Sequence, residues 1–198
     1  MSTIKTALIS AWEKNQALAN FARALQGLGF KIISSGGTKI FLEGLSNFNV
    51  TDVSELTGQK AVLDHRVVTL SPQIHGGLLA EQRHLQELAQ LGWPKIDLVA
   101  VTFYPLEKKL AESEDPDAIN EAVDIGGPAM IRSACKGGRI VVTDEKDFDW
   151  VVNGIETNRL SLCDIEWLQA VAAARVLQYQ ASENLFRVRK LKPIEVPI

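Results

Sequence analysis

The sequence contains little of what builds a disulfide framework, a zinc site or a membrane segment. It has two cysteines, Cys135 and Cys163, which stand far apart and form no CxxC or cysteine–histidine pattern. This argues against structural disulfides and zinc, and it favours reduced thiols in a cytoplasmic protein. No apolar stretch approaches the roughly 20 residues of a membrane-spanning helix, and the N-terminus has no apolar signal region. We therefore expect a cytoplasmic location without membrane association.

An excess of positive charge is also missing. The chain has 21 lysines and arginines against 24 aspartates and glutamates, which gives a net charge of −3. A broad nucleic-acid surface needs clustered positive charge, so nucleic acid is not an expected partner. A local basic pocket for one small anion is compatible with this balance. The three histidines, His65, His75 and His84, show no metal-ligand spacing, and we expect no metal site.

The chain does contain a regular alternation of apolar runs and helical patterns over 198 residues, 46% of them hydrophobic. This alternation predicts an α/β fold, a three-layer α/β/α sandwich with a mainly parallel, doubly wound sheet. The expected strands are Thr6–Ser10, Lys31–Ser34, Val50–Val53, Ile96–Phe103 and Arg139–Thr143. The expected helices are Leu18–Leu28, Ile40–Leu45, Ile74–Leu88, Ala118–Val123, Pro128–Cys135, Phe148–Ile155 and Asp164–Phe186, with Gln59–Ala80 as a long functional loop leading into the third of them.

The domain organisation follows from a composition break near Thr143. We find no repeat, low-complexity tract or linker. The sequence predicts one domain over residues 1–198, with an α/β core at 1–147 and a helical C-terminal extension at 148–198.

The segment Ser34–Thr38 (SSGGT) follows the second expected strand. In open parallel sheets, ligands bind outside the carboxyl ends of the strands. Two glycines would let the backbone approach an anion, Ser35 and Thr38 offer hydroxyls, and the next helix would present free N–H groups. An ordinary strand-to-helix turn explains the motif equally well, so alone it does not decide between the two.

Several further residues could serve the same crevice. Lys14 and Arg66 could supply positive charge, although each alone is more often a surface residue. Asp124–Gly127 (DIGG) places a carboxylate beside a turn with exposed amides. Lys136 is by itself a favourable cation at a helix C-terminus. Trp12 is open to three interpretations, as a lid, a stacking platform or a core residue.

Taken in order, these motifs identify a resemblance to a known family. From about Ala7 to Phe148 the chain resembles the inosine monophosphate cyclohydrolase domain, the N-terminal half of the bifunctional purine-biosynthesis protein PurH. The matching stretches are ALIS, FARALQGLGFKIISSGGT, VTDVSELTG, LDHRVVTLSPQIHGGLLA, IDLVAVTFYPLEK, EAVDIGGPAMIRSACK and VVTDEKDF.

The resemblance implies a methylglyoxal-synthase-like, Rossmann-like fold and a reaction without cofactor or metal. The family closes 5-formamidoimidazole-4-carboxamide ribonucleotide to inosine monophosphate, with release of water. The ligand would be a purine ribonucleotide monophosphate. The family is often dimeric, so a homodimer is expected, and a separate transformylase is a further possible partner.

The resemblance also implies site residues. Tyr104, Asp124 and Lys136 match catalytic positions of the family, where Asp124 and Lys136 would polarise the reacting groups and Tyr104 would orient them or donate a proton. The positions that match the substrate and phosphate pocket are Ser10, Lys14, Ser35, Gly36, Gly37, Thr38, Arg66, Val67, Thr69, Thr102, Ile125, Gly126 and Gly127.

The chain departs from the family pattern at polar positions of the pocket mouth. Val68 stands where the family has a catalytic lysine, and Ser71 stands where it has a histidine. Trp12 replaces a small hydroxyl residue of the family, and Thr102 replaces an asparagine. Loss of one electrostatic contact in a catalytic site typically costs orders of magnitude in rate.

Two hypotheses follow from this mixture of kept and lost groups. One is an active or impaired inosine monophosphate cyclohydrolase, which the joint presence of Tyr104, Asp124 and Lys136 favours. The other is a non-enzymatic nucleotide- or phosphate-binding module with a regulatory or assembly role, which Val68, Ser71 and Trp12 favour. Methylglyoxal synthase itself is a third hypothesis, but the PurH motifs match over more of the chain.

Overall fold

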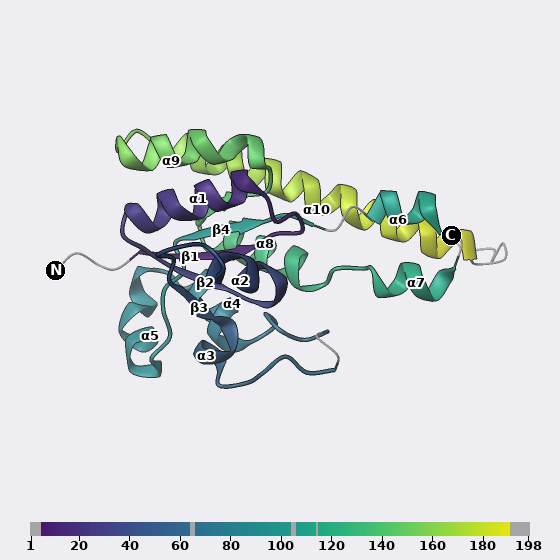
Figure 1. The fold of residues 1–198 in the computed structure, drawn as a ribbon, viewed down its shortest axis with the longest axis horizontal. Helices are drawn as coiled ribbons and strands as arrows, with labels where there is room; N and C mark the ends of the chain where they lie inside the picture. Colours follow the sequence, from purple (N-terminus) through teal and green to yellow (C-terminus); the bar gives the residue numbers. More distant parts are fainter. Residues whose placement is uncertain (1–4, 64–65, 104–105, 114, 191–198) are drawn as a thin grey trace.

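The computed structural model describes residues 5–63, 66–103, 106–113 and 115–190. Within them, five strands form one sheet in the order β3-β2-β1-β4-β5, and every neighbouring pair is parallel. The predicted doubly wound α/β fold is confirmed, because the chain builds outward from β1 on one side and then crosses to β4 on the other (Figure 1). The strands are β1 (Lys5–Ser10), β2 (Phe30–Ser34), β3 (Val50–Asp52), β4 (Leu98–Val101) and β5 (Ile140–Val142).

Alternate strand residues supply two separate cores, one on each face of the sheet. Ala7 and Ile9 of β1 pack with α1 and α9, whereas Leu8 packs with α4 and α8. Side chains of successive strand residues point to opposite faces, which is why both faces are apolar and covered. The helices are α1 (Gln16–Gly27), α2 (Gly36–Glu43), α3 (Val53–Thr57), α4 (Pro72–Leu79), α5 (Leu85–Leu91), α6 (Leu106–Glu112), α7 (Pro116–Glu121), α8 (Gly126–Lys136), α9 (Phe148–Glu156) and α10 (Leu162–Lys190).

The helix α1 illustrates how local sequence sets the element boundaries. The side chain of Asn15 accepts a hydrogen bond of 3.0 Å from the backbone N–H of Leu18 and caps the first turn. After the last turn, Gly29 adopts φ +84°, a backbone conformation that glycine takes at little cost. The predicted helix and its terminating glycine are both confirmed.

Three of the predicted boundaries were wrong. The helix expected at Ile40–Leu45 begins at Gly36, so both glycines of the SSGGT segment lie in its first turn. The helix expected at Ile74–Leu88 is two helices, because Ala80 has extended backbone angles and a 3₁₀ turn follows before α5. The irregular segment before it therefore ends at Ser71, where α4 begins, and not at Ala80.

Two short helices, α3 and α6, were not predicted. Helix α3 had a readable signal, since Asp52 and Glu55 form a reciprocal capping box at its start. Helix α6 lies beside α10 at the far end of the molecule (Figure 1).

The C-terminal helix α10 joins the core to the α6–α7 region. Its first half packs on β5 and α8, and its second half extends past the sheet and contacts α6 (Figure 1). There Tyr179 and Phe186 form a small third core with Leu106 and Ile119.

Across the described ranges, no helix combines the length and the apolar character that crossing a membrane would require.

Candidate functional site

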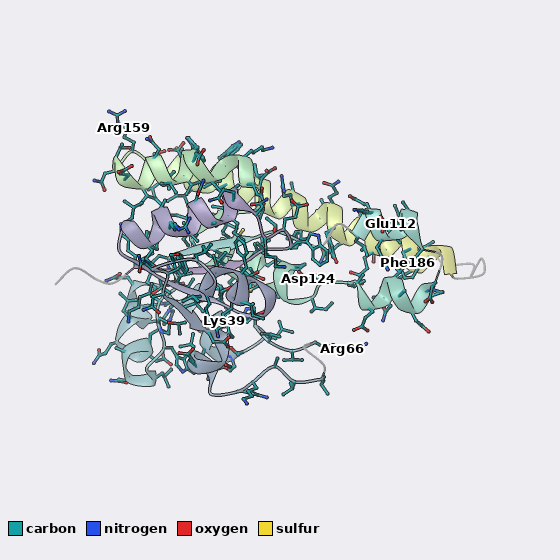
Figure 2. All side chains as sticks on the ribbon, in the orientation of Figure 1. Lys39, Arg66, Glu112, Asp124, Arg159 and Phe186 are labelled. Atoms are coloured by element: carbon teal, nitrogen blue, oxygen red, sulfur yellow. The ribbon has the colours of Figure 1, made fainter. Side chains whose placement is uncertain are left out.

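Three adjoining hollows lie at the carboxyl end of β1, and all three are lined by Ser10. We call them together the groove; their volumes are about 440, 500 and 530 Å³. β1 stands between β2 and β4, so the groove lies at the point where the strand order reverses, the usual ligand position in open α/β sheets. Asp124 and Arg66, labelled in Figure 2, both line it.

The N-terminus of α2 forms one wall of the groove. Ser35 is the N-cap and makes no side-chain cap hydrogen bond, and Gly36 and Gly37 are exposed in the first turn. The first N–H groups of a helix have no partner inside the helix, and the helix dipole makes this end positive. The wall therefore offers backbone donors and a free hydroxyl to an anion.

Thr38 belongs to the scaffold of this wall. Its buried hydroxyl donates a hydrogen bond of 3.0 Å to the carbonyl of Ala11 and accepts one of 3.0 Å from the N–H of the same residue. Because the hydroxyl proton is used there, the Thr38 side chain is not free to donate to a phosphate, in contrast to the expectation that this hydroxyl contacts one. Its backbone N–H belongs to the first turn of α2. It holds the loop after β1 against α2.

Lys14 supplies the positive charge at this wall. Its Cε and Nζ atoms lie only 3.4 and 3.6 Å from where a Cβ on Gly37 would stand, and its ammonium donates 2.8 Å to the carbonyl of Trp12. Burial lowers the pKa of Lys14. The indole of Trp12 is 47% exposed with the ammonium 5.5 Å from its ring centre, which excludes the core interpretation of Trp12.

The segment from Arg66 to Thr69 forms the opposite wall. Arg66 makes an exposed ion pair with Glu121, at the end of α7. Val68 is half-buried, lines two of the hollows and packs against the core that α4 and α8 cover. Thr69 is buried. Val67 pairs through its backbone with Val62 and lines none of the three hollows, although the sequence placed it in the pocket.

The turn from Asp124 to Gly127 carries the carboxylate of the groove. Asp124 Oδ1 accepts a hydrogen bond of 2.9 Å from the N–H of Gly127, and the N–H of Asp124 donates one of 2.7 Å to the hydroxyl of Tyr179 on α10. Burial raises the pKa of Asp124, against the opposing effect of the backbone N–H groups of Gly127 and Gly126. The carboxyl can therefore hold a proton to a higher pH than an exposed aspartate.

Both glycines of this turn are required by close contacts. A Cβ on Gly127 would lie 2.5 Å from Asp124 Oδ2, and a Cβ on Gly126 would lie 2.7 Å from Thr69 Oγ1. The next residue back, Ile125, is 57% exposed and lines the groove with its side chain. The turn is built so that Asp124 and Thr69 both reach the groove.

Of the other two predicted catalytic residues, Lys136 lies far from Asp124 and Tyr104 cannot be placed. Lys136 is exposed in the last turn of α8, ten residues and about 15 Å along the helix axis from Gly126, which begins the helix beside Asp124. It thus lies toward the amino ends of the strands. Tyr104 lies outside the described residues, as does His65.

Two other polar positions have structural tasks. Thr102 Oγ1 accepts a hydrogen bond of 2.9 Å from the N–H of Trp12 and ties the end of β4 to the loop after β1. Ser71, the residue in place of the family histidine, caps α4 by accepting from the N–H of Ile74 at 3.3 Å.

Sequence reasoning missed Glu121, Tyr179 and Arg187 as residues of the site. Glu121 and Arg187 line the groove, and Tyr179 supports Asp124 from behind. No local sequence pattern marks these residues as part of a site. Tyr179 and Arg187 lie on α10, whose apolar spacing predicts only packing of that helix. In the described part of the chain, no three histidine, cysteine or acidic side chains stand close enough to hold a metal ion.

Comparison with known proteins gives a family match and several relatives. The model of the MGS-like domain matches residues 17–129. The chain is 35% identical over 192 residues to the bifunctional purine biosynthesis protein PurH of Aquifex aeolicus (strain VF5), covering 92% of this chain and 38% of that protein. It is 41% identical over 187 residues to the PurH of Mesorhizobium japonicum, covering 90% of this chain and 34% of that protein.

Among solved structures, the crystal structure of ForH superposes with a TM-score of 0.82 at 29% sequence identity, over 93% of this chain and 97% of that one. The chain thus spans about a third of the length of the curated PurH relatives and nearly all of ForH.

Proposed function

We propose that this chain, which belongs to the MGS-like domain family and is a relative of PurH, acts as an inosine monophosphate cyclohydrolase. The cyclohydrolase portion of PurH is its MGS-like domain. The reaction closes 5-formamidoimidazole-4-carboxamide ribonucleotide to inosine monophosphate. The observation that supports the proposal is the Asp124 carboxyl, held in the groove with a raised pKa, in the same groove as the exposed N-terminus of α2.

The two walls of the groove suggest how the nucleotide binds. The 5′-phosphate would accept hydrogen bonds from the first turn of α2 and from Ser35, with Lys14 balancing its charge. The imidazole ring would then extend toward Asp124 and Thr69, which line the neighbouring hollow. This arrangement uses the charged end of the ligand for affinity and leaves the reacting groups at the half-buried carboxyl of Asp124.

Ring closure joins the carboxamide nitrogen to the formyl carbon. As the carbon–nitrogen bond forms, the formyl oxygen gains a proton and the carboxamide nitrogen loses one. The resulting hydroxyl leaves as water when the formamido nitrogen loses its proton and a carbon–nitrogen double bond forms. A protonated Asp124 is suited to donate to the formyl oxygen, and its carboxylate form to accept a proton afterwards.

Val68 favours a second candidate, a nucleotide-binding module without turnover. A valine on the groove wall can neither move a proton nor stabilise an oxyanion, and Lys136 lies at the far end of α8. On this alternative the groove binds the nucleotide as a regulatory or assembly signal. We propose a homodimer, and association with a separate transformylase, as partners under either candidate.

Ring closure by the purified chain, followed by absorbance, tests the first candidate. The expected result is a rate above the spontaneous background that Asp124→Asn lowers by about 10²–10³. Asp117→Asn, an exposed change on α7, should leave the rate unchanged. A rate equal to background rejects the enzyme. Calorimetry with inosine monophosphate then decides the second candidate, because absence of binding rejects the nucleotide module as well.

A further inference from the structure

A second cavity, of about 570 Å³, lies beyond the carboxyl ends of β4 and β5, between these ends and helices α6 and α10. It borders the groove, since Trp12 and Thr102 line both, but it contains neither Asp124 nor the N-terminus of α2. The proposed reaction makes no use of it. We call it the β5 cavity.

The β5 cavity is strongly acidic. Four carboxylates line it, from Glu13, Glu107, Asp144 and Glu145, against the single guanidinium of Arg175. Asp144 is paired with Arg175 and with Lys146, and these contacts hold its pKa low against the opposing effect of burial. The other three make no ion pair among the described residues.

Two of these unpaired carboxylates are fixed in place by neutral donors. Glu145 accepts hydrogen bonds of 2.9 and 3.0 Å from the side-chain amide of Asn15. Glu107 Oε1 accepts one of 2.9 Å from Ser182 and one of 3.3 Å from Gln178. Neutral donors orient a carboxylate without cancelling its charge, so the cavity keeps an excess of negative potential.

Thr143 gives an independent sign of a missing ligand. It lines the β5 cavity, is 3% exposed, and its hydroxyl has no hydrogen-bond partner, whereas its carbonyl accepts 2.6 Å from Arg175. A buried hydroxyl without a partner costs about 1–3 kcal/mol. A ligand with an N–H group in the cavity would remove this cost.

The cavity walls indicate which cation fits. No three acidic, histidine or cysteine side chains converge closely enough for a metal ion anywhere in the described ranges, so the negative charges are spread over separate elements. The rings of Trp12, Phe103 and Tyr179 also line the cavity. Aromatic faces attract organic ammonium groups. The methylene chain of a ligand that carries such groups can also pack on the rings.

We propose that the β5 cavity binds a linear organic polyamine, with one amino group hydrogen-bonded to Thr143 and others facing Glu107 and Glu13. Spread carboxylates on α6 and on the loop after β1 match a ligand whose charges are separated by methylene groups. The inference rests on this cavity alone and does not depend on the function proposed for the groove.

Calorimetry of the full chain with spermidine at low salt tests the proposal. We expect saturable binding with one site per chain, weakened about tenfold by Glu107→Gln and by Glu13→Gln. Glu156→Gln removes the same charge from an exposed position at the end of α9 and should leave the affinity unchanged. Thr143→Val, which keeps the shape, should weaken binding severalfold.

Absence of a saturable signal up to about 10 mM spermidine overturns the proposal. Equal weakening by Glu107→Gln and Glu156→Gln also overturns it, because it indicates only general charge attraction. Displacement of spermidine by equimolar Mg²⁺ overturns it as well. Glu107→Gln keeps the test valid if Thr143→Val fails to fold. Binding of inosine monophosphate, measured on the same samples, reports the groove separately and should be unaffected by Glu107→Gln.

Discussion

The hydroxyl of Tyr179 accepts a hydrogen bond of 2.7 Å from the backbone N–H of Asp124, so helix α10 directly holds the loop that carries the groove carboxyl. The centre of the Tyr179 ring lies 5.1 Å from the centre of the Phe103 ring, which follows the end of β4. The helical region after residue 147 thus supports the candidate site, and changes in it should reach Asp124.

Tyr179→Phe removes this support while keeping the ring. We expect the free energy of unfolding to fall by about 1 kcal/mol at neutral pH, because the half-buried N–H of Asp124 loses its partner. Affinity for inosine monophosphate should fall severalfold. Urea unfolding and calorimetry measure the two effects, and an unchanged affinity would show that α10 does not position the loop.

The same residue predicts an alkaline effect. Burial raises the pKa of Tyr179 to about 12, so between pH 10 and 12 the unfolded chain releases this proton before the folded protein does. Stability should therefore fall as the pH rises through this window. Tyr179→Phe should lack that part of the decline, measured by thermal unfolding from about pH 9 upward.

Gly127→Ala should be destabilising. Its Cβ would meet Asp124 Oδ2 at 2.5 Å and the ring of Phe103 at 3.1 Å, so the carboxyl or the ring must move. We expect a loss of about 1–3 kcal/mol in unfolding free energy. Gly27→Ala is the matched control, since it is helical with nothing within 4 Å and should gain about 0.5–1 kcal/mol. Equal effects of the two changes would contradict the close packing of the turn.

Val68→Lys should raise the rate of ring closure tenfold or more, because it places an ammonium on the groove wall where charge develops; about 10²–10³ is typical for one such contact. Val68→Met has a similar length without charge and should leave the rate unchanged. Steady-state kinetics of the three proteins compare these cases. If Val68→Lys folds, binds inosine monophosphate and shows no gain, Val68 is not what limits catalysis.

Asp124→Asn should lower the rate by about 10²–10³. It should also alter the acid side of the stability profile. Since burial raises the pKa of Asp124, its protonated form contributes stability below the pKa of the unfolded chain, about 3.9. That contribution is lost as the pH rises through the higher folded-state pKa. Thermal unfolding of Asp124→Asn should show a smaller fall over this range, and parallel profiles would argue against the raised pKa.

Glu121→Gln should strengthen the binding of inosine monophosphate. The carboxylate of Glu121 forms an ion pair with the guanidinium of Arg66 on the groove wall, so this guanidinium is not free to bind a ligand. Exposed ion pairs contribute up to about 1 kcal/mol, so releasing Arg66 should improve affinity by no more than about fivefold. Arg66→Met should weaken binding, and if Glu121→Gln weakens it as well, the pair supports the groove and does not compete with the ligand.

Much of the fold was predictable because its signals are local. The strands are short apolar runs buried on both faces, and α1 carries its cap at Asn15 and its end at Gly29. The break at Ala80 was not predictable, because the sequence on both sides of it has helical spacing and only the packing of α4 and α5 on the rest of the molecule separates them.

For the candidate site, the sequence was enough to locate the glycine-rich segment after β2, the Asp124–Gly127 turn and the valine at position 68, because each depends on a few adjacent residues. Only the packed structure reveals that the Thr38 hydroxyl binds the loop after β1, that Lys136 lies at the other end of α8 from Asp124, and that Tyr179 accepts from the N–H of Asp124, 55 positions away. These are contacts between residues on different elements, and they exist only once the sheet and its covering helices have been packed.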